Sequence, residues 1–395
     1  MINVVCGIRS TGRICTDLAE ALEEQGHEVK IAYGRETVPY QYAKYAVKIG
    51  TSFDIKMHGL KARLFDGCGF GSKKATRHFI EWVKEYDPDV IHLHNLHGYY
   101  INIEILFNYL RHSGKKIVWT LHDSWAFTGH SAYCDTIGCE KWKSGCNNCQ
   151  LLGIYPKSYT DNSYSNWKRK KKCLTGIPNM SLVTPSQWLQ KLTQESFLSE
   201  YSVTVIHNGI DTSVFYPTES NIRKEYKIDD KFLLLGVAST WNDMKGYSDY
   251  HKLSDMLNED YQIILVGLTK KQKNEMPKKI LGIERTANIS ELAQLYSAAD
   301  LFLNLSYCEN YPTVNLESLA CGTPVLTYNT GGSPESVQGY NGIIVERGDL
   351  DGVVKAIYQY HNSINNRKPL NHIYKEVFDN KTEINNYLSF LTSNK

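Results

Sequence analysis

The sequence predicts an α/β protein built of two Rossmann-like domains that face each other across a deep interdomain cleft. Strand-like apolar runs alternate with helical periodicity in the first half of the chain, and the same alternation restarts in the second half. The 395 residues exceed what one ordinary core holds, and 42% of them are hydrophobic, which is typical of a globular protein. Because open α/β sheets bind ligands outside the carboxyl ends of their strands, we expect the functional site in the cleft.

The first half opens with an apolar strand at 2–6 that ends at Gly7, and residues 7–13 read as a turn. Apolar side chains then recur at helical spacing from Ile14 to Leu22. Further strands are expected at 29–33, 90–93 and 117–121, and helices at 76–85 and 103–111.

The second half restarts the pattern with strands expected at 232–237, 263–267, 301–305 and 324–327. The join lies near 203–217, where a strand enters an Asn-Gly turn. We therefore assign residues 1–203 to an N-terminal domain and 204–379 to a C-terminal domain. A C-terminal helix near 380–395 is expected to pack back on the first domain.

One segment, from 123 to about 172, breaks the alternation and is predicted to be an insertion rich in Trp, Tyr, Cys and Lys. It ends in five consecutive cations at 168–172. Two interpretations stay open for this run: a solvated helix face, or a contact with an anionic membrane or a phosphate-bearing acceptor.

The insertion also holds four of the ten cysteines, which suit a structural zinc site with four thiolate ligands. His130 is an alternative ligand, and reduced thiols or an oxidised pair are the competing interpretations. The other six cysteines read as small buried hydrophobes. The four clustered cysteines are Cys134, Cys139, Cys146 and Cys149.

A formal net charge of +2 argues against a nucleic-acid partner. No run of about 18 apolar residues predicts a membrane span. The first residues enter a strand directly and lack a basic n-region and a cleavage site. We therefore expect a cytoplasmic protein, with the inner face of the membrane as a further candidate location.

The segment 308–324 carries the candidate chemistry. Pro312 suits the first position of a helix and Gly322 its end, so Glu309 precedes the helix and Glu317 lies inside it. The free amides near Thr313 favour a phosphate, and two flanking carboxylates suit the hydroxyls of a sugar and a ribose. Alternatively, Glu309 caps the helix and Glu317 is merely exposed.

A second candidate ligand-binding turn lies at 329–335, directly after the strand expected at 324–327. There Ser333 is expected to cap a helix, and Gly331 and Gly332 are expected to let the backbone approach a ligand.

Glu309 and Glu317 have the E-x7-E spacing of the retaining glycosyltransferases of family 4, and the chain resembles that family from about residue 2 to 350. Within that family the chain resembles the polysaccharide-assembly branch, which carries an insertion rich in Trp and Cys. The matching stretches are 26–29, 91–95, 121–123, 205–211, 244–246, 296–300, 320–325 and 331–335.

The resemblance implies the GT-B fold and transfer of a sugar, of hexosyltransferase type, from a nucleotide-diphosphate sugar to a carbohydrate or lipid-linked acceptor with retention of configuration. It implies that the domain at 1–203 lies on the acceptor side and that the domain at 204–379 binds the nucleotide sugar. It implies that Glu309 binds the donor sugar and Glu317 the ribose, and that Lys245 neutralises the diphosphate. The other donor-side positions that it implies are Gly12, Tyr311, Thr313 and Val314, and it places His122 beside the reacting sugar.

The resemblance implies no cofactor for catalysis, and no Asp-x-Asp motif stands in a metal-binding context. One departure concerns the arginine that the family carries about five residues before the motif lysine. Thr240 occupies that position here, and Arg9 and Arg13 are the candidate substitutes.

Three histidines alternate along 92–97, and they are expected to pack on a strand at His92 and to approach the cleft at His94 and His97. We assign His97 and Asp123 to the acceptor side and disfavour a metal role for the histidines.

Three alternative functions remain: another GT-B enzyme such as a nucleotide-sugar epimerase or a phosphorylase, a nicotinamide oxidoreductase, and an inactive scaffold with a zinc module. An oxidoreductase predicts G-x-G-x-x-G after the first strand, which residues 7–12 lack. No lysine is marked as a pyridoxal carrier for a phosphorylase. Retention of Glu309, Lys245, His122 and Glu317 opposes the scaffold.

Overall fold

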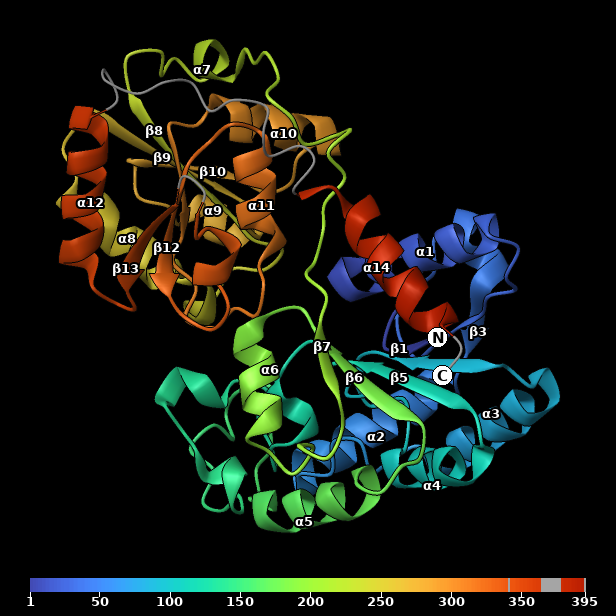
Figure 1. The fold of residues 1–395 in the computed structure, drawn as a ribbon. Coiled ribbons are helices and arrows are strands. Elements are labelled where there is room, and N and C mark those ends of the chain that lie inside the picture. Colours follow the sequence, from blue (N-terminus) through green and yellow to red (C-terminus); the bar gives the residue numbers. More distant parts are fainter. Residues whose placement is uncertain (340–341, 364–377, 394–395) are drawn as a thin grey trace. The chain divides into compact units, whose positions relative to one another are not determined.

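The computed structural model describes residues 1–339, 342–363 and 378–393. The chain divides into two compact units, Met1–His207 with Ile384–Lys395, and Asn208–Glu383. Each unit holds one sheet whose strands are all parallel, with helices on both of its faces (Figure 1). The fold is therefore two Rossmann-like domains of the GT-B class.

The first unit has a seven-stranded sheet in the order β3-β2-β1-β4-β5-β6-β7. Its strands are β1 Ile2–Asn3, β2 Ile31–Tyr33, β3 Ala46–Lys48, β4 Val90–Leu93, β5 Lys116–Thr120, β6 Met180–Thr184 and β7 Val203–Val205. Its helices are α1 Arg9–Glu24, α2 Ser52–Phe65, α3 Lys73–Tyr86, α4 Ile103–Ser113, α5 Ser163–Leu174 and α6 Gln187–Gln194, with 3-10 turns η1 Tyr40–Tyr45, η2 Ser124–Ala126, η3 Cys134–Ile137 and η4 Lys141–Lys143.

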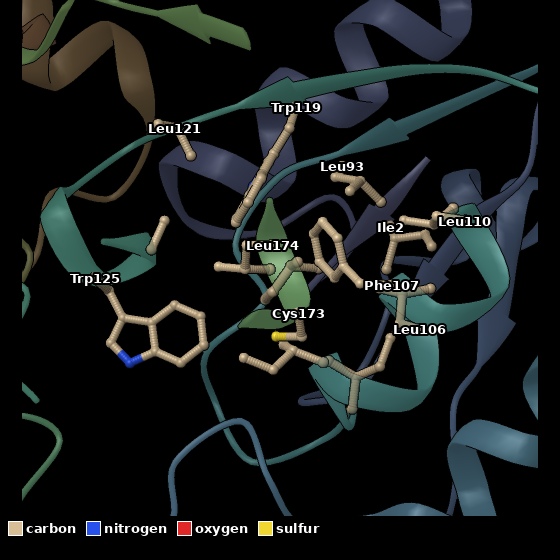
Figure 2. Packing of buried hydrophobic residues seen from close by; sticks show 14 of the residues in the cluster. Ile2, Leu93, Leu106, Phe107, Leu110, Trp119, Leu121, Trp125, Cys173 and Leu174 are labelled. Atoms are coloured by element: carbon tan, nitrogen blue, oxygen red, sulfur yellow. The ribbon is translucent and has the colours of Figure 1, made fainter. Parts of the chain in front are cut away.

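Strand β5 shows why this sheet is apolar on both faces. Ile117 and Trp119 pack with α4, whereas Val118 faces the opposite cluster with α1. Figure 2 shows Trp119 near Phe107 of α4, and their ring centroids are 5.3 Å apart. The Trp119 indole N–H also donates to the His94 carbonyl at 3.0 Å, so the buried ring loses no hydrogen bond.

Helix α14, Asn380–Thr392, packs on the first unit from the far end of the chain (Figure 1). Tyr387 and Leu391 join the cluster of Leu18 and Val118. The Lys116 ammonium donates to the carbonyls of Phe390 at 2.7 Å and of Ser393 at 2.9 Å, which completes the C-terminal end of the helix. The last two residues of the helix expected near 380–395 lie outside the described residues.

The second unit has a six-stranded sheet in the order β10-β9-β8-β11-β12-β13. Its strands are β8 Phe232–Val237, β9 Tyr261–Val266, β10 Ile280–Ile283, β11 Leu301–Asn304, β12 Val325–Asn329 and β13 Gly342–Glu346. Its helices are α7 Ile222–Glu225, α8 Tyr247–Met256, α9 Lys270–Asn274, α10 Ile289–Ala298, α11 Thr313–Ala320 and α12 Leu350–Ser363, with 3-10 turns η5 Asp243–Lys245 and η6 Pro334–Ser336.

Two local expectations were wrong. The predicted turn at 7–13 is helical from Arg9 on, so Gly12 lies in the first turn of α1 and not in a loop. Gly12 packs so close to the preceding segment that a Cβ there would lie 3.0 Å from the Val5 side chain. Ser333 stands at the N-cap of the short 3-10 turn η6 and not of an α-helix, and its hydroxyl makes no capping hydrogen bond because it bonds to Thr327 at 2.6 Å.

The five cations at the end of the insertion are not one solvated face. Arg169 forms two hydrogen bonds of 2.8 Å with the Glu104 carboxylate. Lys170 is buried, donates to the Trp125 carbonyl at 2.6 Å, and lies over the Trp125 ring. Burial lowers the pKa of Lys170 to about 8. The run has helical period, so α5 turns one of its cations into the core and leaves Lys168, Lys171 and Lys172 exposed.

Among the helices that the structure describes, none combines the length and the apolar character that crossing a bilayer requires.

Candidate active site

The carboxyl edge of the sheet in the second unit gathers the polar side chains that the sequence singled out. Lys245 follows β8, Glu309 follows β11, and Thr330 follows β12. The three strands are neighbours in the sheet, so their carboxyl ends open at one edge.

Lys245 and Glu309 form an ion pair at this edge, with 2.5 Å between Nζ and Oε1. The Lys245 side chain is 35% exposed and that of Glu309 only 14%, so the pair is reachable from solvent on the lysine side. The backbone holds both partners in place, because the Tyr307 N–H donates to the Met244 carbonyl at 2.9 Å. A cation beside a carboxylate offers a polar ligand one group for anions and one for hydroxyls.

Helix α11 begins at Thr313, with Pro312 as its N-cap residue instead of its first helical residue. Proline offers no side-chain oxygen, and no side chain caps this end of α11. Glu309 pairs with Lys245, so the helix-cap interpretation of Glu309 was wrong. Tyr311 is buried, and its carbonyl accepts from the Asn208 amide at 3.0 Å. The N-terminal amides of Thr313 and Val314 suit an anion.

Glu317 is buried on the second turn of α11, so the interpretation as an exposed residue was also wrong. Its Oε2 accepts a hydrogen bond of 2.9 Å from the Tyr296 hydroxyl. Burial, together with the Glu317 charge, raises the pKa of Tyr296 well above its usual value, which keeps the hydroxyl a donor. Tyr296 therefore fixes the position of one oxygen, Oε2, of the Glu317 carboxylate.

The paired glycines after β12 serve the Glu309 loop. Gly331 adopts φ +55°, and a Cβ there would lie 1.8 Å from the Glu309 carbonyl oxygen. The Gly332 N–H donates to the same carbonyl at 3.2 Å. Gly331 thus lets two loops touch, and the contact fixes the Glu309 backbone.

In the first unit, His97 lies between two polar partners. Its Nε2 is 2.9 Å from Asp123 Oδ2 and its Nδ1 is 3.0 Å from the Tyr155 hydroxyl. Burial raises the pKa of Asp123, but His97 and the Trp125 N–H outweigh it, and the net pKa lies below the usual value. Asp123 is thus a carboxylate that orients His97.

His122 is half-buried and lies next to two buried histidines, His94 and His92. Its Nε2 is 3.1 Å from His94 Nδ1, and the His94 ring lies 4.1 Å from that of His92. Burial lowers the pKa of His122 to about 4 and that of His92 and His94 well below 6.5. All three are neutral near pH 7, so His122 can donate or accept a hydrogen bond but carries no charge.

Two family models match the chain. The model described as Glycosyltransferase Family 4 matches residues 11–214, and the model described as Glycosyl transferases group 1 matches residues 218–375. The chain belongs to glycosyltransferase family 4. The two models meet close to His207, where the two units of the structure divide.

Among curated relatives of this family 4 glycosyltransferase, the putative colanic acid biosynthesis glycosyl transferase WcaC of Escherichia coli K12 is 24% identical over 356 residues, which are 85% of this chain and 84% of WcaC. The N-acetyl-alpha-D-glucosaminyl L-malate synthase of Bacillus anthracis is 29% identical over 47% of this chain and 51% of that enzyme.

Solved structures agree on the fold. Sucrose-phosphate synthase from Thermosynechococcus elongatus has a TM-score of 0.71 at 16% identity and covers 98% of this chain and 96% of its own. HepE from Anabaena, in complex with UDP, has a TM-score of 0.68 at 14% identity, with 100% and 99% covered.

Sequence reasoning missed the polar network under α11 in this glycosyltransferase. Asn315 is fully buried, accepts from Asn304 of β11 at 2.9 Å, and donates to Ser333 at 3.2 Å and Ser336 at 2.9 Å. The network ties α11 to β11 and to the loop after β12, which are the segments that carry the candidate donor residues. A polar residue on an otherwise apolar helix face was the available signal.

Sequence reasoning also missed Arg347, which directly follows β13. Its Nη1 lies 3.4 Å from the Tyr307 carbonyl, and the Thr330 hydroxyl donates to the same oxygen at 2.9 Å. Arg347 therefore stands at the same sheet edge as Lys245 and Glu309. Thr240 is exposed, and its hydroxyl donates to the neighbouring Ser239 carbonyl. Of the candidates named from the sequence, Arg9 pairs with Glu36 at 2.5 Å and Arg13 is exposed, both in the first unit.

The four clustered cysteines are free thiols, and within the described residues no three His, Cys, Asp or Glu side chains come together as metal ligands. Cys134 is buried against Ser124, and Cys146 accepts from the Gly129 N–H at 3.2 Å. Burial raises the pKa of Cys134 to about 12 and of Cys146 to about 11, which favours the neutral thiol. His130 bonds to Asp66 at 2.5 Å. The described residues thus give the four-thiolate zinc site no support, and the site stays a prediction.

Proposed function

We propose that this glycosyltransferase moves a hexose from a nucleoside diphosphate sugar to a carbohydrate or lipid-linked acceptor, with retention of configuration, in the assembly of a surface polysaccharide. The observation that carries the proposal is the Lys245–Glu309 pair beside the uncapped start of α11. Support comes from HepE, whose structures are titled as complexes with UDP and UDP-glucose, and from WcaC, named for colanic acid biosynthesis. The epimerase alternative gains no support from these relatives.

In this proposal the second unit holds the donor. Glu309 accepts hydrogen bonds from the hydroxyls of the transferred sugar, and Glu317 accepts from the ribose. The backbone of Tyr311, Thr313 and Val314 meets the sugar and the diphosphate. Lys245 exchanges its partner Glu309 for the diphosphate and neutralises the charge that develops as the nucleotide leaves.

Glycosyl transfer passes through an oxocarbenium-like state, so the protein has to stabilise a departing anion and a growing cation. Lys245 and the α11 amides serve the anion. For retention, the donor phosphate takes the proton of the incoming hydroxyl, and no side chain acts as a nucleophile. The first unit contributes Gly12 towards the diphosphate, His122 as a neutral hydrogen-bond partner of the sugar, and His97 with Asp123 towards the acceptor.

A panel of nucleotide sugars tests the proposal directly. The protein is incubated with UDP-, GDP-, ADP- and dTDP-linked hexoses, and release of free nucleotide is measured with and without simple sugar acceptors. Slow hydrolysis of one class of donor is the expected result, and NMR of the anomeric proton then reports retention. Absence of both binding and hydrolysis across the panel would refute the proposal.

In this proposal Arg347 provides the second positive charge for the diphosphate, because Thr240 occupies the position at which the family carries an arginine. The Arg347→Ala variant is expected to bind the nucleoside diphosphate about tenfold more weakly, because one charged contact to phosphate is lost. Calorimetric titration with the nucleoside diphosphate measures this. Adding Thr240→Arg to the variant should restore part of the affinity, and an Arg347→Ala affinity equal to wild type would contradict the role.

In this proposal the Tyr296 hydroxyl positions the Glu317 carboxylate for the ribose. Tyr296→Phe keeps the buried ring but removes a hydrogen bond to a carboxylate, worth about 1.5–3 kcal/mol. We expect the affinity for a ribonucleoside diphosphate to fall about tenfold, with a smaller loss for the 2′-deoxy analogue. An equal loss for both nucleotides would point to a general packing defect instead.

A further inference from the structure

Helix α2, Ser52–Phe65, turns an apolar stripe towards solvent. Phe53 is 70% exposed, Met57 36%, Leu60 50% and Leu64 40%. Successive members are four, three and four residues apart, so the four side chains lie on one side of the helix. Soluble monomers rarely expose contiguous apolar surface of this kind without a binding role.

The opposite side of α2 already packs on the first unit, so the stripe is not a core face that lost its cover. His58 and Ala62 are buried on that side. His58 accepts from the Gly71 N–H at 3.0 Å and bonds to the Ser72 hydroxyl at 2.9 Å. A capping box formed by Thr51 and Asp54 fixes the start of the helix. The helix is thus anchored with its apolar stripe outward.

The insertion extends this surface at the end of α2. The Tyr159 N–H donates to the Arg63 carbonyl at 2.8 Å, and the Thr160 hydroxyl donates to the Leu64 carbonyl at 2.8 Å. Tyr159, which is 74% exposed, therefore stands beside Arg63 at the end of α2, and Phe65, the last residue of the helix, is 62% exposed. We call the exposed apolar surface the α2 patch; its members are Phe53, Met57, Leu60, Leu64, Phe65 and Tyr159.

Cations border the stripe on both sides. Lys56 and Arg63 project to one flank and Lys61 to the other, as their positions on the helix dictate, and all three are exposed. Arg63 also lies over the Tyr159 ring, 5.7 Å from its centroid. Asp54 is the single acidic side chain of α2, and its carboxylate is engaged by Thr51. The patch is therefore apolar at its centre and positive at its rim.

We propose that the α2 patch docks on the surface of an anionic lipid bilayer, with α2 parallel to the membrane plane. The apolar stripe enters the boundary between headgroups and acyl chains, and Lys56, Lys61 and Arg63 contact lipid phosphates. Charge selects this occupant over a second copy of the chain, because a two-fold pairing through the stripe would set the same three cations against each other. The inference does not rest on the proposed function.

Vesicle co-sedimentation tests the inference. The full chain is mixed with vesicles of phosphatidylcholine alone or of phosphatidylcholine and phosphatidylglycerol in equal parts. We expect binding to the mixed vesicles that exceeds binding to phosphatidylcholine at least about tenfold and weakens with salt. The Leu60→Glu variant should bind the mixed vesicles about tenfold more weakly, because a charge replaces a side chain that enters the membrane.

Two further variants keep the test decisive. Lys56→Gln with Lys61→Gln leaves the apolar stripe intact and should weaken binding about fivefold for each cation removed. Ile289→Glu, at an exposed isoleucine of the second unit, is the matched control and should bind like wild type. Circular dichroism confirms that each variant is folded.

Three results would overturn the inference. The first is failure of the wild type to sediment with the mixed vesicles. The second is equal binding to both kinds of vesicle, which would remove the role of the cations. The third is a dimer in analytical ultracentrifugation that Leu60→Glu dissociates, since the patch would then belong to a second copy.

Discussion

Replacing Glu309 with glutamine is expected to slow sugar transfer by about 100-fold or more, while affinity for the free nucleoside diphosphate stays within about threefold of wild type. The Glu309 carboxylate accepts from Lys245 at 2.5 Å, and a glutamine oxygen accepts more weakly from a sugar hydroxyl. Rate measurements with the donor found by the panel, beside calorimetry with the nucleotide, separate the two effects.

Two variants frame this prediction. Lys245→Ala should show the reverse pattern in binding, with nucleoside diphosphate affinity reduced about tenfold or more, because it removes the charge that meets the phosphates. Glu346→Gln is a matched control: Glu346 is an exposed carboxylate bonded to Asn329 at the same sheet edge, and transfer should be unchanged. Unchanged turnover of Glu309→Gln would refute the assignment of Glu309 to the donor sugar.

Acidification is expected to destabilise the first unit strongly between about pH 6.5 and pH 4. Burial lowers the pKa of His58 and of His122 from 6.5 to about 4. The unfolded chain therefore binds protons in this interval that the folded unit does not, so stability is complete above pH 6.5 and falls as the pH drops towards 4. For His58, which is buried, this shift corresponds to roughly 3 kcal/mol, a large share of the stability of a domain, and the half-buried His122 adds less.

His92 and His94 shift in the same direction for the same reason, so they add to the loss. Six of the seven tryptophans lie in the first unit, so urea unfolding followed by tryptophan fluorescence reports on it selectively. In the His58→Gln variant the free energy of unfolding should fall less steeply between pH 6.5 and pH 4, because one of the histidines that take up protons on unfolding is gone. A midpoint that stays constant from pH 7 to pH 5 would contradict the prediction.

Much of the fold was predictable because neighbouring residues encode it. The strands at 90–93 and 232–237 and the helix beginning at 103 stand where periodicity placed them. Where the sequence misled, a distant contact overrode the local signal. Gly12 is typical of a turn, yet it lies in α1, where the absence of a side chain on the glycine lets Val5 pack close to the helix. Lys170 reads as solvated, yet the Trp125 carbonyl and ring hold it in the core.

Glu309 and Glu317 were found by spacing, but spacing left a helix cap and an exposed residue as equal alternatives. The structure separated these because the partner of Glu309 is Lys245, 64 residues away, and that of Glu317 is Tyr296, 21 residues away. The roles of both carboxylates towards a donor remain predictions. Arg347 could not be found at all, since only the pairing of β12 with β13 brings it to this edge.

The sequence by itself determined the alternation of strands and helices and the division into two units. It also placed Glu309 in the loop before a helix and Glu317 inside that helix. Each of these features depends on residues that are close together in the chain. The tertiary structure decided which polar groups meet: Lys245 with Glu309, Gly331 with the Glu309 backbone, and the exposed stripe of α2 with solvent. Those contacts depend on how whole elements pack, and a local pattern does not encode the partner that packing supplies.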